Sequence, residues 1–340
     1  MDATITLAAK TDTGRLGIMF LKRYWEKQRA IAVRKATPNM FADEWSIDKS
    51  LLSVVGIGEE QMLKFLFMQN PTFEELEAWV LEVNGGSLAT DKVMSFNKCL
   101  VEGDIPVALG SDTEMVLSEA DLAFWDENGY VIVRNAVDKQ GCEDAIAAIC
   151  SHIGVDLSNP STWYLGQNKA GIMVQLWQHE TLEKNRRSKR IRDAFRQLWR
   201  REDVFVNADR GGFNPPETDN YKFQGSPLHW DVSLSQPIPF GTQGILYLTD
   251  TQANQGAFTA VPGFQHKVGQ WLQSLPPDAN PREQNFYELG AKPIAANAGD
   301  LIIWHHALPH GASPNTSTAP RIVQYLNYKP VMMDIHPVWL

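Results

Sequence analysis

The stretch Pro227-Leu228-His229-Trp230-Asp231-Val232-Ser233-Leu234 places a histidine and an aspartate one residue apart, in a segment that we expect to enter a strand. Because side chains alternate between the two sides of an extended chain, His229 and Asp231 should point to the same side. A pair of this kind occurs by chance in many proteins. Its value as a sign of a metal site therefore depends on the segments that the fold brings next to it.

Two later segments supply what the pair lacks. Residues 299–304 form a turn and an apolar run that leads to His310, and residues 321–326 begin with Arg321 and have the β-branched and aromatic content of a strand. Two imidazoles and one carboxylate on one face of a metal leave about half of an octahedral sphere open, as expected of non-haem Fe(II) oxygenases. The guanidinium fork of Arg321 suits a carboxylate-bearing co-substrate near those positions.

Some of the eight histidines compete with His310 as the distal ligand. His305 and His306 lie close to it in sequence, but as neighbours at a strand end they face opposite ways. We prefer His310 because of its spacing to Arg321. His266, in the turn Pro-Gly-Phe-Gln-His-Lys, is predicted to make structural hydrogen bonds instead.

Over roughly residues 115–330 the chain resembles the phytanoyl-CoA dioxygenase-like family of Fe(II)/2-oxoglutarate oxygenases. The resemblance rests on a combination of short motifs spread along this region. In chain order they are Leu117–Asp121, Asn128–Val133, His229–Asp231, Gln255–Phe258, Val261–Lys267, Gly299–Leu301, His310-Gly311 and Arg321.

The resemblance implies a cofactor and two co-substrates. It implies that His229, Asp231 and His310 bind Fe(II), that Arg321 holds the distal carboxylate of 2-oxoglutarate, and that O₂ is the second co-substrate. It also implies hydroxylation of an unactivated C–H bond. An intact carboxylate at Asp231 favours this outcome, because related iron halogenases need a small residue there so that chloride can bind.

One position departs from the family pattern. Many relatives carry a serine two places after the distal histidine, where it helps to hold the 2-oxoglutarate carboxylate, but Ala312 stands there in this chain. Ser313, one residue later, is kept as a co-substrate candidate. Gln243 is a second candidate, because it shares a strand face with Ile245 and Tyr247 in the apolar segment 241–249.

The substrate is a small molecule that the sequence does not identify. An acyl-CoA would require clustered basic residues for its phosphates, whereas the chain has a net charge of −9. We therefore expect a free amino acid, lysine among them, or a natural-product intermediate. The alternatives are an acyl-CoA hydroxylase of the phytanoyl-CoA type, a non-catalytic cupin-like metal-binding protein and a zinc hydrolase. The candidate substrate contacts are Gln175, Gln178, Asn207, Arg210 and Trp230.

Composition limits location and partners. With 44% hydrophobic and 21% charged residues, no membrane-spanning run and an acidic balance, the chain is expected to bind neither membranes nor nucleic acid. Three cysteines without CxxC spacing argue against a disulfide framework and for a reducing cytoplasm. The basic run Lys184–Arg201 is predicted to be one amphipathic helix with a solvated basic face.

The chain is expected to have two domains. Residues 113–340 are predicted to form a mainly β domain with flanking helices, whose core is a double-stranded β-helix, the jelly roll of cupins. Residues 1–112 are predicted to form an α-helical extension, in which Thr72–Glu75 is a capping box that starts a helix ending at Val83. The roles open to this extension are a buttress, a cover for the active site and a homodimer contact.

Overall fold

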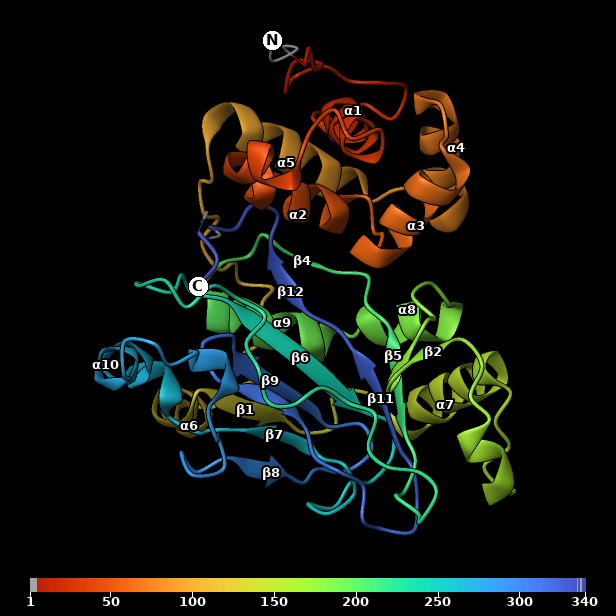
Figure 1. The fold of residues 1–340 in the computed structure, drawn as a ribbon, viewed down its shortest axis with the longest axis vertical. Helices are drawn as coiled ribbons and strands as arrows, with labels where there is room; N and C mark the ends of the chain where they lie inside the picture. Colours follow the sequence, from red (N-terminus) through yellow and green to blue (C-terminus); the bar gives the residue numbers. More distant parts are fainter. Residues whose placement is uncertain (1–4, 335, 337) are drawn as a thin grey trace. The chain divides into compact units, whose positions relative to one another are not determined.

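The chain forms two units in the computed structural model, which describes residues 5–334, 336 and 338–340 (Figure 1). The helical unit consists of described residues up to 108 together with 201–208 and 329–338. The barrel unit consists of residues 109–200, 209–328 and 339–340. The sequence placed the division after residue 112 and expected one uninterrupted domain beyond it. The structure instead returns two short later segments to the helical unit.

Hydrophobic and hydrogen-bonded contacts explain why those segments belong to the helical unit. Phe205 and Met332 pack against its core, and Val331 is part of it. The buried ammonium group of Lys92 donates to the carbonyl of Val206 at 2.6 Å. These contacts join segments that are far apart in sequence, so no local sequence pattern could have predicted them.

The helical unit is built from short helices around one core of buried apolar side chains, which includes Phe20, Leu51, Leu76 and Phe96. Its helices are α1 (Leu21–Ala32), the 3₁₀ helix η1 (Pro38–Glu44), α2 (Trp45–Val54), α3 (Glu59–Gln69), α4 (Phe73–Val83) and α5 (Thr90–Glu102). The Thr72 side chain accepts a hydrogen bond from the backbone of Glu75 at 3.2 Å. The capping box and the end of α4 at Val83 are therefore confirmed.

The barrel unit contains a seven-stranded and a three-stranded antiparallel sheet, in the orders β1-β9-β6-β11-β5-β3-β2 and β10-β7-β8. The strands of the larger sheet are β1 (Tyr130–Val133), β2 (Lys169–Ala170), β3 (Met173–Val174), β5 (Gly211–Asn214), β6 (Thr242–Tyr247), β9 (Leu301–His305) and β11 (Arg321–Tyr325). Those of the smaller are β7 (Phe258–Ala260), β8 (Lys292–Ile294) and β10 (His310–Ala312). A separate two-stranded sheet pairs β4 (Val204–Val206) with β12 (Tyr328–Pro330), and its residues other than Tyr328 belong to the helical unit.

One hydrophobic core lies between the two sheets of the barrel unit. Ile245, Ile302 and Val323 enter it from the larger sheet, and Phe258 and Ile294 enter it from the smaller one. The prediction of a double-stranded β-helix with flanking helices is confirmed. We call the face of the larger sheet that points into this core the inner face.

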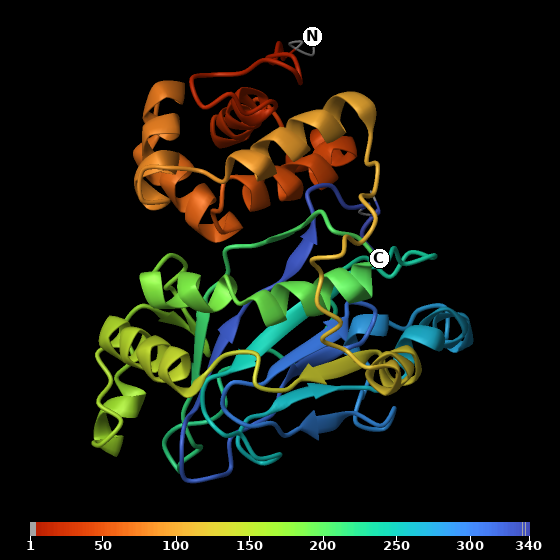
Figure 2. The same ribbon diagram turned by 180° about the vertical axis from the view of Figure 1, so that it is seen from behind.

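Helices cover the outer face of the larger sheet. These are α7 (Lys139–Ile153), α8 (Glu180–Arg186) and α9 (Lys189–Trp199). In the reverse view of Figure 2, α9 passes in front of the strands and α7 lies toward one edge of the sheet. The α8 residue Asn185 donates to Gln324 of β11 at 3.1 Å. The α9 residue Phe195 lies so close to Gly244 of β6 that a side chain there would meet its ring. The remaining helices of this unit are α6 (Glu119–Asn128) and α10 (Val268–Ser274), with 3₁₀ turns at Pro160–Tyr164, Phe264–His266 and Pro281–Glu283.

Two local predictions were wrong. The basic run is two helices, because α8 ends at Arg186 and the Ser188 side chain caps a new helix, α9. Arg186 is only 1% exposed and hydrogen-bonds to backbone carbonyls, so it is not part of a solvated basic face. The segment after Asp231 is not a regular strand, and His229 makes a single β-bridge instead.

The turn before β9 provides a test of the fold. Gly299 has a φ of 88°, and a Cβ on it would lie 2.4 Å from the carbonyl oxygen of Val137. We expect Gly299→Ala to lower the free energy of unfolding by about 2–4 kcal/mol, measured by urea denaturation. Gly290→Ala is the matched control, because Gly290 has a φ of 96° with nothing near its Cβ position. Equal losses in the two variants would show that the contact with Val137 has no effect.

Candidate metal centre

His229, Asp231 and His310 lie together in the barrel unit, with their ligand atoms all within 4.8 Å of one another. The Nε2 atoms of His229 and His310 are each 3.4 Å from a different oxygen of Asp231. The backbones of the two histidines exchange hydrogen bonds of 2.9 Å, which bring the segment with His229 and Asp231 beside β10. No other group of three or more histidine, cysteine or acidic side chains within the described residues has this spacing.

Both imidazoles are oriented for metal binding. The Nδ1 atom of His229 lies 2.7 Å from the carbonyl oxygen of Pro227, and that of His310 lies 3.0 Å from the carbonyl oxygen of Leu308. Because a carbonyl only accepts hydrogen bonds, each Nδ1 carries the proton. Each Nε2 therefore faces Asp231, and in the neutral ring it is the nitrogen that can bind a metal, as in protein metal sites whose imidazoles are held from behind.

The aspartate is held as an anion. Burial acts to raise the pKa of Asp231, but hydrogen bonds with His229, His310 and Gln243 outweigh it and hold that pKa far below its usual range. The hydrogen bond to Asp231 in turn raises the pKa of His229. The Asp231 side chain is 51% exposed, so a cation can reach this carboxylate from solvent. The donor set of two nitrogens and one carboxylate oxygen fits Fe(II).

Gln243 contacts the carboxylate ligand. Its amide nitrogen donates to Oδ2 of Asp231 at 2.7 Å, and its amide oxygen accepts from the indole N–H of Trp304 at 3.1 Å. The sequence made Gln243 a co-substrate candidate on the condition that the strand face it shares with Ile245 and Tyr247 points inward. The register of β6 against β9 pairs Gln243 with Trp304 and places Gln243 on the inner face.

Arg321 is a buried cation with no partner. Its side chain is 0% exposed, and none of its three guanidinium nitrogens has a hydrogen-bond partner among the described residues. Leaving a buried charge unpaired is costly, so this position favours an anionic ligand that pairs with it. Asn214 stands opposite Arg321 on the neighbouring strand, and its buried Oδ1 also has no partner. No local sequence pattern points to Asn214, because only the register of β5 against β11 places it opposite Arg321.

Ser313 makes its contacts within the chain. Its backbone N–H donates to the carbonyl of Ala257 at 3.0 Å, and its hydroxyl lies 3.4 Å from the same oxygen. Its role toward 2-oxoglutarate stays a prediction.

The five substrate candidates lie in different surroundings. Gln175 and Arg210 are in neighbouring segments beside the inner face, and Gln178 lies between β3 and α8. Asn207 belongs to the helical unit, where its side chain accepts from Ser53 at 2.6 Å. Trp230 is 2% exposed and donates to the carbonyl of Ala307, so its ring is part of the hydrophobic core.

The other histidines make structural contacts. The Nδ1 atom of His305 accepts from the backbone of Ala307 at 3.0 Å, and burial lowers the pKa of His305 to about 3. His306 is bonded to the carbonyl of Pro239. His266 lies 2.6 Å from the carbonyl oxygen of Asp126, so the predicted structural role is confirmed.

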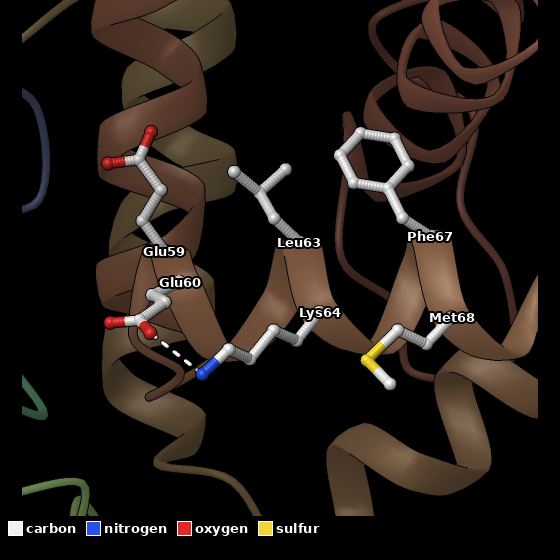
Figure 3. Close-up of a pocket in the computed structure, with 6 residues that line it drawn as sticks. All are labelled: Glu59, Glu60, Leu63, Lys64, Phe67 and Met68. Carbon is white, nitrogen blue, oxygen red and sulfur yellow. Dashed lines mark ion pairs between the residues drawn. The ribbon is translucent and has the colours of Figure 1, made fainter. Parts of the chain in front are cut away.

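A surface hollow in the helical unit has a different character. It has a volume of about 520 Å³ and follows one side of α3, where Leu63, Phe67 and Met68 line it (Figure 3). Glu60 and Lys64 form an ion pair of 2.8 Å along its edge. Because its charged groups all form ion pairs within the chain, with Glu59 bonded to Lys49, and because it contains no candidate metal-binding cluster among the described residues, we assign it no part in the chemistry.

Comparison with known proteins identifies the family. The family model for phytanoyl-CoA dioxygenase (PhyH) matches residues 125–323, more than half of the chain. The chain belongs to the phytanoyl-CoA dioxygenase family. It is therefore an Fe(II)/2-oxoglutarate-dependent oxygenase that uses O₂, and the expected cofactor and co-substrates are confirmed.

Individual relatives are distant. A putative phytanoyl-CoA dioxygenase of Dictyostelium discoideum is 22% identical over 259 residues, which cover 61% of this chain and 74% of the relative. The solved non-haem carbocyclase SnoK from nogalamycin biosynthesis is 18% identical, with a TM-score of 0.45 over 65% of this chain and 87% of its own. HygX from Streptomyces hygroscopicus, solved with nickel and 2-oxoglutarate, is 16% identical, with a TM-score of 0.41 over 63% of this chain and 87% of its own.

Within the described part of the chain, no helix is both long and apolar enough to cross a bilayer.

The choice of His310 over its neighbours can be tested directly. We expect His310→Ala to weaken Fe(II) binding at least about 100-fold and to abolish nearly all turnover, because it removes one of the three candidate ligands. Calorimetric titration with Fe(II) without oxygen measures the first effect. His306→Ala is the control, and we expect it to keep its Fe(II) affinity. Loss of Fe(II) in the control, with retention in His310→Ala, would show that the distal ligand is His306.

Proposed function

We propose that this oxygenase hydroxylates an unactivated C–H bond of a small polar metabolite. A free amino acid, lysine among them, is the preferred substrate class, and a natural-product intermediate is the next. In this proposal His229, Asp231 and His310 hold Fe(II), and Arg321 holds 2-oxoglutarate. Fe(II) held there would supply the activation of O₂, and the role of the chain is to bind, orient and shield the reactants.

The buried and unpaired guanidinium of Arg321 is the observation that carries the assignment. A 2-oxoglutarate carboxylate placed there would pair with a cation that the fold leaves without a partner. Arg321 points from the inner face, as does Gln243, which contacts the metal ligand Asp231. One face of the sheet therefore provides both an anion site and a contact to the metal centre. The retained carboxylate of Asp231 favours hydroxylation over halogenation, because it occupies the position that chloride would need.

A row of polar residues beside the inner face supports the substrate class. Tyr325 lies opposite Arg210 across the backbone, since the Tyr325 N–H donates to the Arg210 carbonyl at 2.9 Å. In the antiparallel pairing of β3 with β5, Met173 stands opposite Gly212. The same register continued by two residues places Gln175, the residue after β3, beside Arg210. Both amide atoms of Gln175 are buried without a hydrogen-bond partner among the described residues.

The chemistry of this row suits an amino acid. A guanidinium such as that of Arg210 binds carboxylates, and Arg210 is already oriented, with its guanidinium 5.8 Å from the Trp177 ring centre and its Nε 3.6 Å from Asp209. The Gln175 amide offers both a donor and an acceptor, which an ammonium or hydroxyl group of the substrate would satisfy.

An acyl-CoA substrate is less well supported. Its phosphates would need available basic groups, and the run from Lys184 to Arg201 was the best source in the sequence. Lys189, Arg192 and Arg196 all lie within 3.5 Å of the buried carboxylate of Asp193, and Arg201 is bonded to two aspartates. Each of these four groups therefore already has a carboxylate partner within the chain. A cytoplasmic location and a homodimer through the helical unit remain predictions.

The function is tested by a screen for succinate release. The purified protein is incubated with Fe(II), ascorbate and 2-oxoglutarate, and with free amino acids or CoA esters as separate sets of substrates. We expect substrate-dependent succinate with a member of the amino-acid set, together with a product heavier by one oxygen atom in mass spectrometry. Stimulation by CoA esters alone would refute the proposed substrate class.

Arg321 provides a prediction for the co-substrate. We expect Arg321→Ala to raise the KM for 2-oxoglutarate by on the order of 30- to 4,000-fold, because losing a buried charge pair costs about 2–5 kcal/mol. Arg321→Lys should restore only part of the affinity, because a point charge cannot replace the guanidinium fork. Steady-state kinetics with varied 2-oxoglutarate measures both variants. An unchanged KM in Arg321→Ala would remove the 2-oxoglutarate assignment.

Gln175 provides a prediction for the substrate. We expect Gln175→Leu to raise the KM of the primary substrate by about 5- to 150-fold, because a lost buried hydrogen bond costs about 1–3 kcal/mol. The KM for 2-oxoglutarate should stay unchanged. Gln140→Leu is the control, since Gln140 is an exposed α7 residue bonded to Asp144. A rise in the 2-oxoglutarate KM in place of the substrate KM would assign Gln175 to the co-substrate.

A further inference from the structure

We propose that Gln243 is a positioning residue that fixes which oxygen of Asp231 faces the iron, and that Trp304 orients the Gln243 amide for this task. The inference rests on the proposed function, because it takes His229, Asp231 and His310 as the iron ligands. Neither Gln243 nor Trp304 would touch the metal or the substrate in this role.

Gln243 has a rigid base. It lies on β6, which is hydrogen-bonded to β9 on one side and to β11 on the other, so its backbone cannot shift without breaking a ladder. The side chain extends from the inner face to the carboxylate, and its Nε2 lies 2.7 Å from Oδ2 of Asp231. A hydrogen bond between an amide donor and a charged acceptor is stronger than a neutral one.

Trp304 removes the ambiguity of the amide orientation. An indole N–H can only donate, so the Gln243 atom 3.1 Å from it must be the amide oxygen. Because the amide is planar, its NH₂ group then points to Asp231. Trp304 is itself held in place, since it is 3% exposed and its ring centre lies 4.4 Å from that of Phe258 and 5.0 Å from that of His310.

The result is a carboxylate whose two oxygens are not equivalent. Oδ2 of Asp231 accepts from Gln243 and lies toward His310, while Oδ1 lies toward His229. With Oδ2 engaged by the amide, Oδ1 is the oxygen left to bind the metal. Without Gln243 the half-exposed carboxylate could rotate, and its geometry as a ligand would no longer be defined. Contacts of this kind typically change metal affinity by about 10- to 100-fold.

Equilibrium metal binding tests the inference without turnover. Fe(II) and Co(II) are titrated into the protein without oxygen and without 2-oxoglutarate, and the visible spectrum of bound Co(II) reports the coordination geometry. We expect Gln243→Met to weaken Fe(II) binding by about 10- to 100-fold and to change the Co(II) spectrum at saturation. Trp304→Phe should weaken binding less. The double variant should bind no more weakly than Gln243→Met, because Trp304 acts through Gln243.

Gln324→Met is the matched control. Gln324 is a buried glutamine of the same sheet, on the outer face, and its amide likewise makes one donated and one accepted hydrogen bond. We expect the control to keep the Fe(II) affinity of the wild type within about twofold and to leave the Co(II) spectrum unchanged.

The outcomes separate the possible failures. An unchanged Fe(II) affinity in Gln243→Met, or an equal loss in Gln324→Met, would overturn the role of Gln243. An additive loss in the double variant would overturn the role of Trp304. A wild-type protein that binds neither metal would refute the proposed function itself, and this inference with it.

Discussion

Two backbone hydrogen bonds between His229 and His310, each 2.9 Å long, join segments that are far apart in sequence. The segment around His229 forms no regular strand, so this single bridge aligns it with β10, which is paired with β7. Both ligand histidines also use a nearby backbone carbonyl to fix their ring orientation. The geometry of the candidate metal centre therefore depends on the main-chain pairing of His229 with His310. This pairing also sets where the Asp231 side chain lies, because Asp231 is two residues after His229.

The two faces of the larger sheet treat polar groups differently. On the outer face, Gln324 is bonded to Asn185 and to the carbonyl of Leu182, so its hydrogen bonds are satisfied within the protein. On the inner face, Arg321 and Asn214 keep buried polar atoms without partners among the described residues. Leaving such atoms without hydrogen bonds costs free energy in the unliganded protein. A polar ligand that bonds to them removes this cost. This contrast within one sheet is why we assign the inner face to ligand binding.

Sequence reasoning succeeded where a function depends on local spacing. The capping box at Thr72 can be inferred from neighbouring residues, and the proximity of His229 and Asp231 from their spacing, although the segment that holds them forms no regular strand. The position of Asn214 opposite Arg321 could not be, because register between distant strands leaves no local signal. The same limit applies to Gln243, whose shared face with Ile245 and Tyr247 was predicted but whose partner was not. The break between α8 and α9 was missed because the helical pattern continues across Ser188.

The buried arginines show why Arg321 is best explained by a ligand. Arg186 is 1% exposed and is bonded to Glu183 and to backbone carbonyls, and Arg201 is bonded to Asp104 and Asp203. The fold thus gives each of these two guanidinium groups an acidic partner from its own chain, as buried charges require, although Nε of Arg186 has no hydrogen-bond partner among the described residues. Arg321 is as deeply buried as Arg186, yet it has no such partner among the described residues. A purely structural arginine would gain nothing from this environment, whereas an arginine that binds a dicarboxylate must keep its fork free.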